Sequence, residues 1–245
     1  PTKLTPQLAT LIESRLQQTW FPEEIVGAEL VGVLSFKTIY SWIHRGFLAV
    51  TEKVLRRKGK KPGTQEKRGR FNVKKTIKDR PQEVENRKTF GHWELDTMVS
   101  SRGQSKGCLA TFVERKTRFY IAIKMDDRSK DSMFLAISSL YNTLTSKLLK
   151  TFTVDRGKEF ACFEQVETEF GIPMYFADAY AAWQRGSNEN SNGLLREFFP
   201  KKTDLAKVTL DKLTEALVLI NNRPRKCLGF KTLFDMFKHE IKKLI

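Results

Sequence analysis

The sequence predicts a mixed α/β domain that is preceded by a small all-α module. After residue 90, three β-rich runs are followed by helix, strand, helix, strand and helix, an order typical of a mixed α/β fold. Residues 1–50 instead carry apolar residues at helical spacing and no strand-like run. A strongly basic segment separates the two. We therefore expect domains over 1–50 and 90–245, joined by a linker over 51–89.

The N-terminal module is expected to contain three helices. Apolar spacing predicts the first over 4–18, and Pro22 suits the first turn of a second over 21–30. Ser35 can cap a third over 35–43. Two short helices joined by a tight turn, the second with a polar outer face, are typical of a helix-turn-helix; a plain three-helix bundle is the alternative. The side chains expected to contact DNA here are Ser35, Lys37, Thr38, Ser41 and Arg45.

The basic segment holds most of the excess positive charge. The chain has a formal net charge of +16, and 53–80 contain 13 Lys or Arg against two acids. Such a charge favours a polyanion partner, although a ribosomal or membrane-surface protein would also fit. A solvated charge run is the usual reading of such tracts, but its position between two domains favours contact with DNA. The residues expected to bind phosphate are Arg56, Arg57, Lys60, Lys61, Arg68 and Arg70.

The α/β part can be read element by element. The expected strands are 92–100, 108–115, 118–125, 150–155 and 172–177, and the expected helices are 129–144, 159–170, 187–199 and 210–221.

No stretch of the sequence reaches 18 consecutive apolar residues, so no membrane span is expected. The polar start of the sequence predicts no signal peptide.

Three acids stand out by their place in this order. Asp96 lies within the first strand, Asp155 ends the fourth, and Glu189 lies early on the helix after the fifth. The first and fourth strands of such a sheet can be neighbours, which would bring Asp96 and Asp155 together. Three nearby acids remain alternatives: Glu94, Glu159 and Asp178.

Converging carboxylates suit metal-dependent phosphodiester cleavage. Two divalent cations about 3.5–4 Å apart can activate water and stabilise the leaving oxygen. Mg²⁺ prefers oxygen ligands, and three carboxylates would repel one another without a cation. We expect two Mg²⁺ ions, with Mn²⁺ as a substitute. The three cysteines and three histidines have neither disulfide nor zinc spacing, and His92 is expected to make a structural hydrogen bond.

The local sequence around all three acids carries a family resemblance. The blocks GHWELDT, VDRGKEF, YAAWQRGSNENSNGLLREFFPKKTD and NNRPRKCLGFKT resemble the DDE transposases of insertion sequence family thirty (the IS-thirty family). The first two are also similar to retroviral integrases. The resemblance covers about 5–245 and implies an RNase H-like, integrase-type core with Asp96, Asp155 and Glu189 as catalytic and metal-binding triad. It also implies that 5–45 are the family's second DNA-binding module; members of the family usually have another such module upstream, which this sequence does not contain.

One departure concerns the second acid. The family's usual Asp-Asn-Gly is Asp155-Arg156-Gly157 here. Arg156 could lower activity by obstructing the metal site, or it could bind the scissile phosphate. The other residues of the core expected to contact DNA are Trp183, Arg185, Asn192 and Arg196.

The resemblance implies a sequence-specific transposase. It would bind the terminal inverted repeats of its element, hydrolyse one strand at each end, and use the released 3′-hydroxyl to attack target DNA. Joining two ends requires a homodimer or higher oligomer. We expect it in the bacterial cytoplasm, on the nucleoid. A nuclease on the same fold and a catalytically silent DNA-binding repressor are the rivals.

Overall fold

The computed structural model describes residues 4–55, 75–101, 105–178 and 181–244. Its contacts group into two units. The helical unit comprises Pro1–Gln65 and Val218–Asp235, and the sheet unit comprises Glu66–Leu217 and Met236–Ile245. The division differs from the predicted boundaries, because 218–235 were expected to belong to the α/β domain.

The helical unit contains the three expected N-terminal helices. They are α1 (Pro6–Gln17), α2 (Pro22–Glu29) and α3 (Phe36–His44). The Ser35 side chain accepts a hydrogen bond from the backbone N–H of Lys37 at 3.3 Å, which confirms the predicted cap. The core of this unit is built from Ile12, Leu16, Ile25, Leu30, Ile39, Trp42, Ile43 and Leu48. The unit also holds η1 (Glu52–Val54), β6 (Pro224–Arg225), η7 (Lys226–Leu228) and β7 (Lys231–Thr232).

The β6–β7 hairpin packs against α2, which explains why this part of the C-terminal sequence groups with the N-terminal helices. Glu24 of α2 pairs with Arg225 at 3.5 Å. Gly27 lies so close to the Phe230 ring that an added Cβ would fall 2.1 Å from it. Only a residue without a side chain admits the ring at this point of α2.

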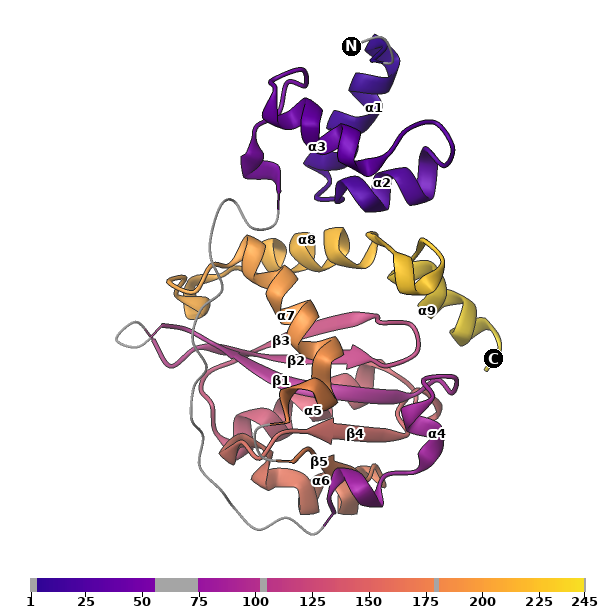
Figure 1. The fold of residues 1–245 in the computed structure, drawn as a ribbon. Coiled ribbons are helices and arrows are strands. Elements are labelled where there is room, and N and C mark those ends of the chain that lie inside the picture. The colour runs from indigo at the N-terminus through magenta and orange to yellow at the C-terminus, as the bar shows by residue number, and fades with distance from the viewer. Residues whose placement is uncertain (1–3, 56–74, 102–104, 179–180, 245) are drawn as a thin grey trace. The chain divides into compact units, whose positions relative to one another are not determined.

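The sheet unit is built on one five-stranded sheet with the order β3-β2-β1-β4-β5 (Figure 1). Strands β1, β2 and β3 form an antiparallel meander, and β4 and β5 run parallel to β1. The strands are β1 (His92–Val99), β2 (Cys108–Glu114), β3 (Tyr120–Met125), β4 (Thr151–Val154) and β5 (Met174–Phe176). The predicted mixed α/β class is confirmed, and so is the adjacency of the first and fourth strands.

The two faces of the sheet differ in chemistry. Figure 1 shows α7 (Gly186–Phe198) across the face nearer the viewer and α5 (Lys130–Thr143) behind the sheet. The α5 face carries the apolar core, in which Trp93 and Leu95 are fully buried. Because side chains alternate along a strand, Asp96 lies on the α7 face. The α5 side also holds η3 (Ser146–Leu148), η4 (Lys158–Cys162) and α6 (Phe163–Phe170).

Part of the expected linker is packed on the sheet. The carbonyl of Lys75 accepts the N–H of Phe176 at 3.1 Å. Arg80 is buried and donates to the Thr153 hydroxyl at 3.0 Å, and Val84 is fully buried. The short helices here are η2 (Ile77–Asp79) and α4 (Gln82–Glu85). The rest of the basic tract, 56–74, lies outside the described residues.

Two C-terminal helices complete the chain, α8 (Leu210–Asn221) and α9 (Leu233–Lys242), with η6 (Leu205–Lys207) before them. The α8 helix was predicted and α9 was not. Phe237 of α9 stacks on Phe119 with ring centroids 4.0 Å apart. In the described part of the chain, no helix has the length and apolar character needed to cross a membrane.

Candidate active site

Asp96 and Asp155 lie side by side on neighbouring strands, with Asp96 within β1 and Asp155 directly after β4. His92 pairs with Thr151 and Glu94 with Thr153 in the parallel β1–β4 ladder. Continuing that register by two residues places Asp96 beside Asp155. Both carboxylates are on the α7 face. The structure thus brings together the two aspartates that the sequence predicted to be neighbours.

One guanidinium lies between these two carboxylates. Nη2 of Arg185 donates to Oδ2 of Asp155 at 3.2 Å, and Nη1 lies 3.6 Å from Oδ1 of Asp96. Nη1 also donates to the Leu95 carbonyl at 3.2 Å. The exposed fractions of the three side chains are 12% for Arg185, 17% for Asp96 and 15% for Asp155, so solvent screens these ion pairs only partly. Arg185 ends η5 (Ala182–Arg185), immediately before α7.

Further hydrogen bonds fix the orientation of both carboxylates. Nδ2 of Asn192 donates to Oδ2 of Asp96 at 3.1 Å, and the Tyr120 hydroxyl donates to Oδ1 of Asn192 at 2.7 Å. Burial, reinforced by the charge of Asp96, raises the pKa of Tyr120 well above its usual value, so the phenol stays a donor. The N–H of Gly157 donates to Oδ1 of Asp155 at 2.9 Å.

Glu189 lies in the first turn of α7 and is exposed. Within the described ranges, no three acidic, His or Cys side chains come close enough together to hold a metal ion. The structure therefore places Asp96 and Asp155 together, whereas Glu189 is not gathered with them.

The residue before Glu189 anchors α7 to the sheet. The backbone N–H of Asn188 donates to Oε2 of Glu94 at 3.0 Å, and its Nδ2 donates to the Glu94 carbonyl at 2.9 Å. The Thr111 hydroxyl donates to Oδ1 of Asn188 at 3.2 Å. Glu94 also forms a fully buried ion pair with Arg115. The first turn of α7, which carries Glu189, is thereby fixed to β1 and β2.

The alternative acids have structural partners instead. Glu94 holds α7 and Arg115, as described. Glu159 is buried, pairs with Arg128 at 2.7 Å and accepts the Thr97 hydroxyl at 3.0 Å. Asp178 accepts from Nε2 of Gln184 at 3.1 Å.

The residues predicted to contact DNA differ in exposure, and some of them lie outside the described part of the chain. Lys37 and Arg45 are exposed, as is Ser35, whereas Thr38 and Ser41 of α3 are half-buried. Arg56, Arg57, Lys60, Lys61, Arg68, Arg70 and the side chain of Trp183 lie outside the described residues.

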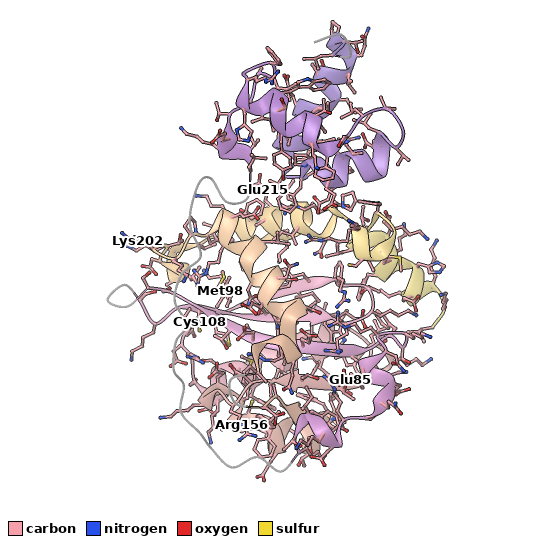
Figure 2. All side chains as sticks on the ribbon, viewed as in Figure 1. Glu85, Met98, Cys108, Arg156, Lys202 and Glu215 are labelled. Atoms are coloured by element: carbon pink, nitrogen blue, oxygen red, sulfur yellow. The ribbon has the colours of Figure 1, made fainter. Side chains whose placement is uncertain are left out.

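Two predicted contacts of the core are engaged within the sheet unit. Nη2 of Arg196 donates to the Val99 carbonyl at 2.7 Å. Nε of Arg156, labelled in Figure 2, donates weakly to the Ala177 carbonyl at 3.4 Å.

The His and Cys side chains take no part in the site. Nδ1 of His92 lies 2.8 Å from the Thr151 hydroxyl, the predicted structural hydrogen bond, and burial lowers the pKa of His92 to about 4. Burial also raises the pKa of Cys108 and Cys162 to about 12. These two thiols are protonated near neutral pH and make poor nucleophiles.

The aspartate pair fits a hard divalent cation. Its donors are carboxylate oxygens, the ligand type that Mg²⁺ prefers. A positive charge, the Arg185 guanidinium, already lies between the two side chains. The position is thus one where the protein itself needs a cation.

Comparison with known proteins shows the family to which the chain belongs. The family model described as "Integrase core domain" matches residues 86–182. The transposase for insertion sequence element IS4351 of Bacteroides fragilis is 35% identical over 253 residues, covering 97% of this chain and 75% of the relative. Transposase InsI for element IS30A of Escherichia coli is 34% identical over 243 residues, covering 92% of this chain. The chain belongs to the IS30 family of transposases. It spans 63% of the length of InsI.

A solved structure supports the fold of this IS30-family chain. The catalytic core domain of BIV integrase superposes with a TM-score of 0.50 at 19% identity, covering 64% of this chain and all of that core. At this identity the likeness concerns the fold alone, and it confirms the expected integrase-type, RNase H-like class.

Sequence reasoning missed several residues of this IS30-family site. It assigned Arg185 and Asn192 to DNA, whereas here both contact the aspartates. It overlooked Asn188 and Tyr120. For Asn188 a signal was present, since its place beside Glu189 in the NEN block predicts a residue that holds the first helical turn. No local pattern marks Tyr120, because its contact with Asn192 spans 72 residues.

Proposed function

We propose that this chain carries the DNA-binding and catalytic parts of a transposase. In this proposal it binds the terminal inverted repeats of its own insertion sequence, cuts one strand at each end and joins the end to target DNA. The observation that carries the proposal is the pair of carboxylates at the same register on β1 and β4, with a cation between them. A homodimer or larger oligomer would hold the two ends.

Asp96, Asp155 and Glu189 would hold two Mg²⁺ ions, with Mn²⁺ able to replace them. When bound, such ions supply Lewis acidity and neutralise charge at the scissile phosphate. Asn192 keeps one oxygen of Asp96 in a fixed direction, and Asn188 holds the turn that carries Glu189. Fixed ligands matter because small displacements of reacting groups are costly to rate.

The proposed chemistry has two steps and no covalent protein intermediate. In the first, a water oxygen bonds to phosphorus and the bond to the 3′ oxygen breaks, which leaves a 3′-hydroxyl at the element end. In the second, that hydroxyl attacks a target phosphodiester and displaces a 3′ oxygen of the target. The buried, protonated state of Cys108 and Cys162 agrees with the absence of a thiol nucleophile from this scheme.

The helical unit would supply sequence recognition. Lys37 and Arg45 are exposed on and just after α3, while Ile39, Trp42 and Ile43 are buried in its core. A short helix with one face buried and cationic side chains outside is suited to the major groove.

A nicking and strand-transfer assay on terminal-repeat DNA in Mg²⁺ tests the proposal. Asp96→Asn, Asp155→Asn and Glu189→Gln should each lower both reactions by at least about a hundredfold, and double changes should add little because the three act as one unit. Binding to the repeat should survive these changes. Lys37→Ala should instead weaken repeat binding by about 1–3 kcal/mol if it contacts a base edge, with a smaller loss on random DNA.

Asp178→Asn is the matched control for the catalytic changes. An asparagine can still accept from Gln184, so this variant should keep most activity. Glu94 and Glu159 are unsuitable controls because both are buried in ion pairs. Full activity in Asp155→Asn would overturn the catalytic assignment, cutting without strand transfer would favour a nuclease, and binding without cutting by the parent would favour a repressor.

A further inference from the structure

Arg185 occupies the space that a metal shared by Asp96 and Asp155 would need. Its two terminal nitrogens reach one carboxylate each, at 3.6 and 3.2 Å. A Mg²⁺ ion binds carboxylate oxygens at about 2.0–2.1 Å. A dication at that distance and a guanidinium on the same oxygens would overlap and repel each other.

Within the described part of the chain, the Arg185 guanidinium has one buried donor without a partner, as has that of the structural Arg80. Among the described residues, the buried Nε of Arg185 has no hydrogen-bond partner. Arg115, by contrast, donates from Nε to the Val84 carbonyl and from Nη1 to Glu94. A buried donor without a partner carries a desolvation cost that no hydrogen bond offsets. This cost favours movement of the Arg185 side chain to a position where the donor has a partner.

The Arg185 side chain can move away from the two aspartates without movement of helix α7. Arg185 belongs to η5, whereas α7 is fixed at Asn188 by hydrogen bonds to β1 and β2. A side-chain rotation, or a local shift of η5, would open the aspartate pair without displacing Asn192 from Asp96.

We propose that Arg185 is the internal counter-cation of the Asp96–Asp155 pair and that a divalent metal must displace it. The inference rests on the proposed function, since it assumes a metal at these aspartates. In metal-free protein, Arg185 holds the two carboxylates together against their mutual repulsion. In metal-bound protein, its guanidinium is released. Arg185 therefore lowers the apparent metal affinity and makes the metal-free site more stable.

Mn²⁺ titration by calorimetry on the full chain tests this displacement. Arg185→Gln should bind Mn²⁺ about tenfold more tightly than the parent. This is expected if Arg185 bridges Asp96 and Asp155 in about 90% of metal-free parent molecules. Its melting temperature in chelator should fall below that of the parent, because the two carboxylates then lose the guanidinium that bridges them. Saturating Mn²⁺ should remove that deficit.

Three further variants make the test specific. Arg156→Gln removes the same charge beside Asp155 without breaking this ion pair, so it should change Mn²⁺ affinity less than about threefold. Arg185→Lys keeps the charge but cannot reach both carboxylates as a fork, so its affinity should lie between those of parent and Arg185→Gln. Asp155→Asn should abolish Mn²⁺ binding in either background.

The outcomes separate the inference from the proposed function. If Asp155→Asn removes Mn²⁺ binding but Arg185→Gln and Arg185→Lys both bind as the parent does, the displacement is wrong and the metal site stands. If no variant binds Mn²⁺ through Asp155, the proposed function fails with it. If Arg156→Gln tightens Mn²⁺ binding as much as Arg185→Gln does, the loss of any positive charge near the site explains the effect. The specific displacement of Arg185 is then overturned.

Discussion

Arg156 follows the catalytic candidate Asp155 directly, yet the contacts give it a different neighbour. Its Nε donates to the Ala177 carbonyl at 3.4 Å, while the cation on the Asp155 carboxylate is Arg185. Obstruction of the metal position is therefore better attributed to Arg185. This leaves phosphate binding as the favoured role for Arg156.

Arg156→Asn should accordingly weaken DNA binding and slow cleavage. Loss of one phosphate contact should flatten the slope of log affinity against log salt by about 0.9. Mn²⁺ affinity should stay close to that of the parent. Salt-dependent fluorescence anisotropy with repeat DNA, together with the cleavage rate, measures both effects. A faster cleavage rate in the variant would instead support obstruction by Arg156.

At the level of single residues, sequence reasoning could pair Asp96 with Asp155 because alternation and strand order determine both positions. It could not assign Arg185 to that pair. An arginine near the active site of an enzyme that acts on nucleic acid can bind a phosphate or a carboxylate. Which of the two Arg185 contacts depends on where η5 places it, and the sequence alone does not show this. Glu189 stays a prediction, since its side chain is exposed on α7.

Among the elements, α7 depends on one buried residue for its attachment. Asn188 is fully buried and uses its backbone N–H, its Nδ2 and its Oδ1 against β1 and β2. Because Arg185 directly precedes this turn and Glu189 lies within it, its attachment sets the geometry of the site.

Asn188→Ala should loosen that turn. The Glu94 carbonyl and the Thr111 hydroxyl would lose a partner in a buried setting, at a cost of about 1–3 kcal/mol. The melting temperature should fall by roughly 2–4 °C per kcal/mol for a protein of this size. Below the transition, cleavage should still be at least about tenfold slower, because the ligands are misplaced.

Gln165→Ala, on the exposed side of α6, is the control and should change stability by less than about 0.5 kcal/mol. Thermal unfolding and a cleavage rate measured well below both transitions give the two quantities. An Asn188→Ala protein that melts and cuts like the parent would show that α7 is held by its apolar contacts alone.

The elements that sequence reasoning found are those whose own residues determine them. Strands β1 to β3 are β-rich runs separated by turns, and helix α3 has a periodic apolar face and a cap. The elements it missed depend on distant partners. Hairpin β6–β7 is very short and packs against α2. Residues 75–89 are polar in composition but bury Arg80 and Val84 against the sheet and its edge.

At the scale of the whole molecule, positive charge is concentrated in one stretch. The formal net charge is +16, and 56–74 alone contain nine Lys or Arg and one acid. Two parts of the predicted tract remain, 53–55 and 75–80, and the second includes Lys75 paired with Glu167 and the buried Arg80. Lys53 and Lys78 are exposed as well, so most of the charges expected to bind DNA, but not all, lie within 56–74.

Replacing the nine basic residues of 56–74 with Ser or Gln keeps the length of the segment and removes its charge. Non-specific DNA binding should weaken strongly, because each phosphate neutralised contributes about −0.9 to the slope of log affinity against log salt. The slope should flatten by several units. Metal affinity should stay unchanged, since the aspartates are held by Arg185 and Asn192.

A control that neutralises exposed lysines elsewhere separates this effect from that of net charge. Lys201, Lys202, Lys212 and Lys238 are exposed in the sheet unit. Their substitution should change the salt slope less per charge than substitution within 56–74. Equal changes per charge would mean that DNA responds to the overall field of the protein. An unchanged slope after substitution of 56–74 would mean that the segment is solvated and makes no contact with phosphate, so that DNA affinity must come from the two folded units.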